Sequence, residues 1–514
     1  MGYLAAHGPG NFRELILGFG LGSTVVRTLW VCSSAAFVIA GLSYFIAFAC
    51  CTFLRQWSSL VICLLLSLYV VSPYFVLLGW RALWGADGLF SGLPGLRMMS
   101  PILSYGSIGI IAVLTIRYLP IGVLLTYLRV SALPLRQIQV AQNLGLPSFR
   151  IHRKLYFRWS LPALGLVILF AAIFGSLDNL VSNLAGGGNI QIIANLLDDW
   201  QRSQEYQGRA MGLGLCYVLL VMAFLLIALR LFSIGESPTS RGSVQEEGKV
   251  TGELGRSIGI LAIVTIVLIE LSLVAGLLYF GMGGRAGNFP TFMGLTRLVS
   301  DDELLSALLL AVWIAIRVSL LGTSLAALSI LARHIKEGID PRYDMRKATA
   351  NDTILLIPLI TPPFLGGIAA GAFQGRMMGL SGSDWSIVVL HTVVFGPLAY
   401  FVIMAGMKKL SSNSYRVSKN LGLNIRTYAR NILWPACRST IVISILLVFT
   451  FSLNESVMAR YVGGFSQPFG VLIANKQVAA LDLQHYWVVS LIFILSLVAL
   501  WAFSLFLRQR GTIR

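Results

Sequence analysis

Several features of catalytic and metal-binding proteins are missing from this sequence. The six cysteines include no CxxC pair, and neither H-E-x-x-H, G-x-S-x-G nor a paired histidine cluster occurs among the 514 residues. These absences argue against zinc sites, disulfide frameworks and a membrane-embedded enzyme. We therefore expect a chain with no catalytic residues, no metal site and no bound cofactor.

The sequence also lacks a nucleotide-binding loop and a cleavable signal peptide. Gly242 and Gly248 precede Lys249, but five residues separate the two glycines, and Val250 stands where a P-loop has Ser or Thr. Residues 1–24 have neither a positive n-region nor a strong h-region, so insertion would rely on the first membrane span. ATP binding to this chain itself is not expected.

Apolar residues dominate what is present. Hydrophobic residues make up 56% of the chain and the mean hydropathy is +0.79, which exceeds what a soluble core of this length would hold. Backbone polar groups must be paired inside a bilayer, so apolar runs of about 20 residues without strand alternation predict spanning helices. The sequence predicts an all-α integral membrane protein in contact with the lipid bilayer.

Eleven apolar runs have the length of a membrane span, five in the first part of the chain and six in the second. They cover residues 29–51, 60–80, 104–127, 161–177, 211–231, 258–280, 304–331, 353–372, 387–407, 441–457 and 487–506. The first part thus has one leading span fewer than the second, which suggests an initiation codon upstream of Met1.

The distribution of charge predicts the topology. Residues 129–160 carry six Lys and Arg and residues 408–438 carry seven, in both cases without an acid, whereas residues 178–209 carry four acids and two basic residues. By the positive-inside rule the two basic intervals are cytoplasmic and the acidic one is outside. Membrane topology also explains the net charge of +18 better than nucleic-acid binding does.

A polar stretch rich in Ser, Gly and Glu divides the chain. We expect residues 232–257 to be a cytoplasmic linker between a first domain, 1–231, and a second domain, 258–514. Each domain carries a marker: V-A-Q-N-L-G-L at 140–146 returns 277 residues later as V-S-K-N-L-G-L, with five of seven positions identical. This repetition predicts two homologous helical bundles in parallel repeat around a pseudo-twofold axis, with a pathway between them.

The repeated markers resemble the EAA motif of the permease subunits of ATP-binding cassette importers. Gly422 and Pro435 keep the thirteen-residue interval of that motif, and in the first copy Pro162 matches a second proline that often follows. Gln139 and Arg416 occupy the acidic position, so the salt bridge of the family's glutamate cannot form, and the sequence does not say what replaces it.

The resemblance extends beyond the markers. S-L-D-N at 176–179 and S-L-N-E at 452–455 look like the family's next span, and L-I-T-P-P-F-L-G-G-I-A at 359–369 is most similar to spermidine/putrescine permeases. Two permease domains in one chain also occur in iron(III) and thiamine importers.

This resemblance implies a type I importer permease in the bacterial inner membrane. Each marker would form a coupling helix that docks on one copy of a separate ATPase homodimer, which binds the ATP, and a periplasmic solute-binding protein would deliver the solute. The implied coupling residues are Gln139, Ala141, Asn143, Gly145 and Arg153 in the first marker, and Arg416, Ser418, Asn420, Gly422 and Arg430 in the second.

Polar residues in or beside the apolar runs are candidates for the solute path, because ionisable groups at membrane depth are costly. They are Asp178, Asn179, Glu270, Asn454 and Glu455. Helix ends exposed to the periplasm are the other interpretation of Asp178 and Glu455, and packing is the other interpretation of Glu270. We expect His391 to be a satisfied interior residue and Arg317 to anchor its span at the outer interface.

The expected function is that of the transmembrane permease of an ATP-binding cassette importer. The acids would suit a cationic solute, but the sequence does not distinguish a polyamine from iron(III) or thiamine. The alternative is an ion-coupled secondary transporter with parallel repeats, in which Asp178, Glu270 or Glu455 would hold the ion. Uptake that collapses with an uncoupler while ATP is maintained would favour this alternative.

Overall fold

The computed structural model describes residues 21–511 apart from a set of gaps. The gaps are residues 53, 55–56, 86–87, 93–94, 96–97, 99, 132, 134, 186–189, 203–211, 215, 217–218, 221–222, 224–252, 284–291, 340–354, 356, 359–360, 362, 375–378, 380–381, 408–413, 477–480 and 482. Most of the predicted span at 211–231 and most of the predicted linker at 232–257 lie outside the described residues.

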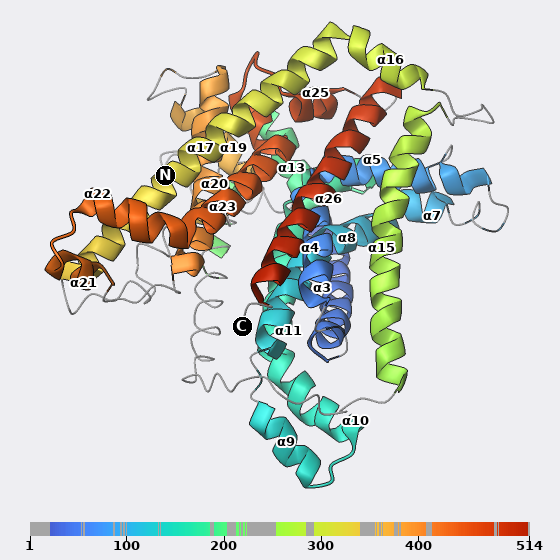
Figure 1. Ribbon diagram of the computed structural model, residues 1–514. Coiled ribbons are helices and arrows are strands. Elements are labelled where there is room, and N and C mark those ends of the chain that lie inside the picture. Colours follow the sequence, from blue (N-terminus) through green and yellow to red (C-terminus); the bar gives the residue numbers. More distant parts are fainter. Residues whose placement is uncertain are drawn as a thin grey trace, which may run out of the picture. The chain divides into compact units, whose positions relative to one another are not determined.

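All regular elements among the described residues are helices (Figure 1), and the chain divides into two compact units. Unit 1 comprises Met1–Thr296 and Asp482–Arg514, and unit 2 comprises Arg297–Leu481. Two helices from the second half of the sequence, α15 (Glu253–Gly281) and α26 (Leu483–Gly511), therefore belong to unit 1.

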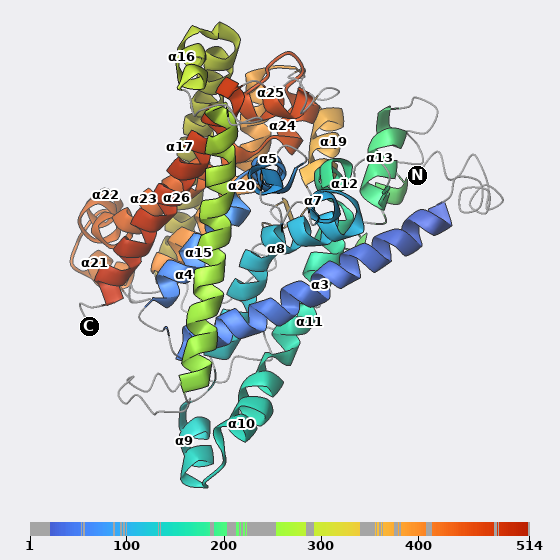
Figure 2. The ribbon, with the colours of Figure 1, turned by 90° about the vertical axis from the view of Figure 1, so that its right-hand side faces the viewer.

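Unit 1 is built around three long helices that pack on one another (Figure 2). They are α3 (Leu21–Thr52), α8 (Gly106–Ser131) and α11 (Arg158–Ser176). The other elements of this unit are α4 (Ser58–Val70), α5 (Pro73–Trp84), η1 (Leu89–Gly92), α7 (Ser100–Ser104), α9 (Leu135–Asn143), α10 (Ser148–Ile151), η2 (His152–Phe157), α12 (Asn179–Ala185) and α13 (Ile193–Arg202), while α16 (Met293–Ser300) runs across the boundary to unit 2.

Helices α15 and α26 pack on α5 and α4 respectively, and on each other. Glycine allows α5 and α15 to approach closely: a Cβ at Gly79 would lie 3.2 Å from the carbonyl oxygen of Leu273. Tight contact between backbones is how helices associate in a membrane, where hydrophobic association between them is weak. The packing of α15 therefore depends on glycine as well as on apolar side chains.

Unit 2 has the same kind of core, made of α17 (Asp302–Ile339), α20 (Asp384–Met407) and α23 (Trp434–Asn454). Helices α17 and α20 cross at two glycines, since a Cβ at Gly322 would lie 3.3 Å from the Cα of Gly396. The other elements are α19 (Pro363–Phe373), α21 (Ser414–Asn420), α22 (Ile425–Tyr428), η4 (Ala429–Leu433), α24 (Val457–Val462) and α25 (Phe469–Asn475).

Five helices among the described residues are long and apolar enough to cross a membrane: Gly22–Thr52, Gly106–Ser131, Phe149–Ser176, Asp302–Lys336 and Asp384–Met404. The helix pair Ile425–Arg438 and Thr440–Asn454, bent by 57°, would make a sixth. The predicted all-helical membrane architecture is thus confirmed, while the parallel repeat and the number of eleven spans stay predictions.

One predicted span differs from the structure for a local reason. The run 60–80 is divided into α4 and α5, with Ser72 in an extended conformation at φ −50° and ψ 135° between them. Pro73 follows it directly; proline has no N–H for the helix ladder and pushes the preceding residue out of the helical region. Hydropathy detected the apolar run but not this break.

Candidate functional site

The first marker forms a helix, a tight turn and a second helix. The turn follows α9 and closes with two hydrogen bonds, Gly145 N–H to the Gln142 carbonyl at 2.8 Å and Leu146 N–H to the Ala141 carbonyl at 3.1 Å. Gly145 has φ +70°, a conformation that costs glycine little and other residues more. These bonds define a Schellman motif, which satisfies the last carbonyls of α9.

The second marker has the same turn. After α21, the N–H of Gly422 bonds the Lys419 carbonyl and the N–H of Leu423 bonds the Ser418 carbonyl, both at 3.0 Å, and Gly422 has φ +76°. Ala141 and Ser418 are both buried below their turns. The repeated letters N-L-G-L therefore encode one local geometry that occurs in each unit.

Each turn presents two apolar side chains to the exterior. Val140 and Leu144 are 56% and 74% exposed, and Val417 and Leu421 are 54% and 73% exposed. Residues four apart lie on one helix face, so each marker carries an apolar knob of the same shape. These four residues were not among those predicted from the sequence, although their repetition within the marker was a signal that could have found them.

The polar residues of the markers surround these knobs. Gln139 and Asn143 are exposed on the first, Asn420 is exposed on the second, and Arg416, partly buried, has an interaction partner of its own. Arg153 and Arg430 follow the turns and are exposed. Neither marker brings an acid to the surface at the position that the family motif gives to glutamate.

A π-helical joint follows each turn. Element η2 begins at His152 and η4 begins at Ala429, and these starting positions are again 277 residues apart. Single π turns inside α-helices are frequent at functional sites. In unit 1 the joint is part of a helical run from Phe149 to Ser176, which connects the first turn directly to the apolar core.

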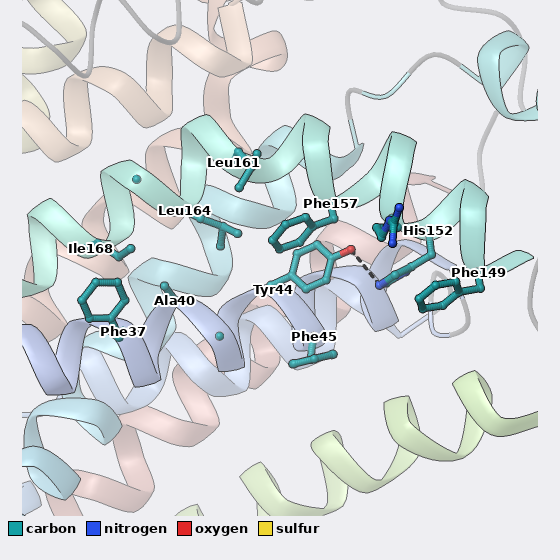
Figure 3. A pocket seen from close by; sticks show the side chains of 13 residues that line it. Phe37, Ala40, Tyr44, Phe45, Phe149, His152, Phe157, Leu161, Leu164 and Ile168 are labelled. Atoms are coloured by element: carbon teal, nitrogen blue, oxygen red, sulfur yellow. Dashed lines mark hydrogen bonds between the residues drawn. The ribbon is translucent and has the colours of Figure 1, made fainter.

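A hydrogen bond between a tyrosine and a histidine connects each joint, or the residue directly before it, to the first long helix of its unit. In unit 1 the hydroxyl of Tyr44 on α3 lies 3.1 Å from Nε2 of His152, as Figure 3 shows. In unit 2 the residue types are exchanged: Nε2 of His334 on α17 lies 2.6 Å from the hydroxyl of Tyr428. Ser414 on α21 also bonds that hydroxyl, at 2.9 Å.

Asp178 is buried at the end of α11 and all its polar interactions are internal. Its Oδ2 lies 3.0 Å from Nε of Arg117 and accepts a hydrogen bond from the Tyr118 hydroxyl at 3.2 Å. Its Oδ1 accepts from the backbone N–H of Val181 at 3.2 Å, in the first turn of α12. The carboxylate is therefore both half of an ion pair and the cap of the next helix.

Glu455 has the corresponding role at the end of α23. Its two oxygens accept from the backbone N–H groups of Met458 at 2.7 Å and Ala459 at 3.0 Å, at the start of α24. Its Oε2 also lies 3.1 Å from Nε2 of His391, whose Nδ1 is 2.9 Å from the Ser452 hydroxyl. His391 is thus an interior residue with partners on both ring nitrogens, as expected, but its pairing with Glu455 was not predicted from the sequence.

The other predicted residues are distributed more widely. Asn179 begins α12, Asn454 is buried and donates to the Thr450 carbonyl at 2.9 Å, and Glu270 is buried on α15. Arg317 pairs with Asp384 at 2.8 Å between the rings of two tryptophans, Trp313 and Trp385. Asp178, Asn454 and Glu455 are thus each bonded to residues of their own unit.

These features define a class of protein: a helical membrane protein that presents the same turn, apolar knob and joint twice and buries an acid–base pair in each bundle. Residues 349–510 match the sequence profile of the family described as binding-protein-dependent transport system inner membrane component. Residues 349–510 are thus similar to the inner-membrane components of binding-protein-dependent transport systems.

Three relatives are similar to parts of this chain. The spermidine/putrescine transport system permease protein PotC of Haemophilus influenzae is 27% identical over 170 residues, which cover 33% of this chain and 63% of the relative. The ferric transport system permease protein FbpB of Actinobacillus pleuropneumoniae is 23% identical over 138 residues, 24% of this chain and 20% of the relative. The putative ferric transport system permease protein FbpB 1 of Haemophilus influenzae is also 23% identical over 138 residues, 24% of this chain and 22% of the relative. The match spans less than two thirds of the length of each relative.

Proposed function

We propose that this chain is the transmembrane permease of an ATP-binding cassette importer, with two homologous bundles in parallel repeat and about eleven spans. The observation that supports this most directly is a repeated group of features: each unit has one Schellman turn, one exposed apolar pair and one π joint. Two equal docking points are what a homodimeric partner requires. A separate ATPase homodimer is the proposed partner, and it binds the ATP.

The two markers are proposed as the coupling helices. Val140 and Leu144 on one, and Val417 and Leu421 on the other, would enter a groove on the ATPase, because exposed apolar patches are typical of binding surfaces. The polar coupling residues around them would set the orientation: Gln139, Ala141, Asn143, Gly145 and Arg153, and Arg416, Ser418, Asn420, Gly422 and Arg430.

Movement of the first coupling helix would be transmitted along the run Phe149–Ser176. At 1.5 Å per residue, its 28 residues span about 42 Å, so a displacement at the turn reaches the region of Asp178 through one helical element. The joint η2 lies at the start of this lever, where a change in helix direction has the greatest effect. Closure of the ATPase dimer would thus tilt the bundle between inward-open and outward-open states.

The proposed solute path passes Asp178 and Asn179 in one bundle and Asn454 and Glu455 in the other, with buried Glu270 as a third acidic candidate. Arg117 already pairs with Asp178, and His391 with Glu455. A solute that binds either carboxylate must therefore compete with a basic side chain of the protein. A periplasmic binding protein would deliver the solute. By analogy with the relatives and the resemblance, we propose a cationic solute such as a polyamine, iron(III) or thiamine.

The experiment that tests this function is affinity purification of the tagged full chain from membranes of its own host. We expect an ATPase of the ATP-binding cassette class to co-purify with the wild-type chain, identified by mass spectrometry. Gly145→Val and Gly422→Val should each lower its yield several-fold, because a β-branched residue at positive φ is strained by about 1–2 kcal/mol and distorts the turn. Gly145→Asn and Gly422→Asn are the matched controls, because asparagine tolerates this conformation.

Equal recovery of the ATPase with the wild type and both valine variants would contradict the coupling assignment. Recovery of no ATPase with the wild-type chain, combined with uptake that an uncoupler abolishes while ATP is maintained, would favour the ion-coupled transporter instead.

A further inference from the structure

A groove of about 590 Å³ runs between α3 and α11 in unit 1 (Figure 3). Its lining is apolar over most of its length and includes Phe37, Phe45, Phe157, Leu161, Leu164 and Ile168. Both flanking helices are long and apolar enough to cross a membrane, so we expect the apolar lining to face the hydrocarbon. A volume of this size matches that of small-molecule sites in proteins.

Two glycines keep the groove open. Gly41 on α3 and Gly165 on α11 both line it, and a Cβ built on either would meet nothing within 4 Å. The residue 277 positions after Gly165 is Val442, so the second bundle has a side chain at the matching place. The absence of a side chain at Gly41 and at Gly165 therefore contributes to the opening.

One end of the groove is polar and basic. Tyr44 and His152, joined by their hydrogen bond, and Arg153 all line it there. Lys154 is exposed beside them without lining the groove, and the interval 129–160 around them contains no acid. An occupant with an anionic head at this end would meet a cation and no competing carboxylate from this segment.

We infer that this groove is a binding site for one anionic phospholipid, with an acyl chain along the apolar lining and the phosphate beside Arg153. Lipid is favoured over a soluble anion because the apolar part of the site is much longer than its polar end, and burying a chain contributes about 0.8 kcal/mol per CH₂. Anionic lipid is favoured over neutral lipid because a Lys or Arg near a membrane surface contributes about 1 kcal/mol toward an acidic head group.

This site has a structural consequence for the coupling segment. His152 and Phe157 are the first and last residues of η2, and both line the groove. A lipid in the groove would pack against the π joint. The lipid composition of the membrane would therefore affect the stiffness of the helical run that carries the first turn. The inference concerns this chain and a lipid, and it holds whether or not an ATPase is the partner.

The test is native mass spectrometry of the purified full chain titrated with dioleoyl phosphatidylglycerol or dioleoyl phosphatidylcholine. We expect one phosphatidylglycerol to be retained in preference to phosphatidylcholine. Arg153→Gln should weaken phosphatidylglycerol binding about fivefold, which corresponds to about 1 kcal/mol, and leave phosphatidylcholine unchanged. Lys154→Gln, the matched control for general surface charge, should have a smaller effect.

A second pair of variants tests the apolar part. Gly165→Leu and, separately, Gly41→Leu should lower retention of both lipids by filling the groove, whereas Val442→Leu should leave it unchanged. Monodisperse elution of each variant shows that it is folded, and having two filling variants keeps the test decisive if one misfolds.

Four outcomes would overturn the inference. The first is unchanged phosphatidylglycerol retention in a folded groove-filling variant, and the second is an equal effect of Arg153→Gln and Lys154→Gln. The third is displacement of the lipid by millimolar inorganic phosphate, which would indicate an anion site without an acyl chain. Cross-linking of Gly165→Cys to another segment of protein would show that a helix occupies the groove, and that would also overturn the inference.

Discussion

At the scale of single residues, the two buried carboxylates have the same kinds of partner but pair with different basic side chains. Asp178 pairs with an arginine and Glu455 with a histidine, and each carboxylate also accepts backbone hydrogen bonds from the helix that follows it. A buried carboxylate with this many partners is stable without a ligand. The question for function is whether these acids serve the solute or only the fold.

A charge-paired double variant separates these roles. Asp178→Asn leaves the Arg117 guanidinium buried without a counter-charge, so we expect the free energy of unfolding to fall by about 3–5 kcal/mol. Uptake should fall with it. Asp178→Asn combined with Arg117→Gln removes both charges and should recover most of the stability. If Asp178 lies on the solute path, uptake should stay low in the double variant.

Thermal unfolding of the purified chain and uptake in cells are the two measurements. Glu303→Gln is the control, because the 3.5 Å pair of Glu303 with Lys476 is at the surface, where ion pairs contribute little. Wild-type uptake by the double variant would assign Asp178 to the fold alone.

At the scale of elements, the π joints and their tyrosine–histidine bonds connect each surface turn to the core. In unit 1 the segment around the turn also has an apolar core of its own, in which Ala141, Ile151 and Tyr156 are buried. The turn is therefore fixed to the joint by packing, and the joint is fixed to α3 by the Tyr44–His152 bond. In unit 2 the corresponding hydrogen bond joins His334 on α17 to Tyr428.

Removal of one hydroxyl should loosen this connection without removing the ring. We expect Tyr44→Phe and Tyr428→Phe each to cost about 1 kcal/mol, since the tyrosine–histidine hydrogen bond is lost while the aromatic packing remains. In the reconstituted complex with its ATPase, the number of solute molecules moved per ATP should fall, while ATP hydrolysis continues.

The matched control is Tyr415→Phe, because the Tyr415 ring packs edge-on against Tyr428 and the substitution keeps that ring. An unchanged ratio of transport to hydrolysis in both variants would show that these bonds support the fold and do not transmit movement.

At the scale of the whole molecule, the decisive question is the side of the membrane on which the two turns lie. In a cysteine-free background, Leu144→Cys and Leu421→Cys should react with a membrane-impermeant maleimide only after the cells are permeabilised, because the flanking basic intervals predict a cytoplasmic position. Both native side chains are well exposed, so access in the folded protein is not limiting.

Phe465→Cys provides the positive control for the opposite side. Phe465 is 99% exposed and follows the span predicted to end at residue 457, on the expected outer side, so it should be labelled in intact cells. Labelling of either turn from outside would contradict the proposed coupling to a cytoplasmic ATPase.

Properties set by neighbours in the chain were readable from the sequence. Hydropathy predicted the apolar helices, and the repeated letters N-L-G-L marked the two places where the structure has a turn at a glycine with positive φ, Gly145 and Gly422. Asp178 and Glu455 were identified because a charge inside an apolar run stands out without any knowledge of its surroundings. Topology and the repeat are still predictions that depend on these local patterns.

Tertiary structure decided which distant residues meet. Glu455 and His391 are 64 residues apart, and their pairing depends on how α20 packs on α23, which neither hydropathy nor spacing encodes. The same is true of Arg117 with Asp178, of the assignment of α15 and α26 to unit 1, and of the groove beside Gly41 and Gly165. Local sequence sets the conformation of each helix, but contacts between helices depend on their packing angles and on close approach at small residues, which only the folded chain reveals.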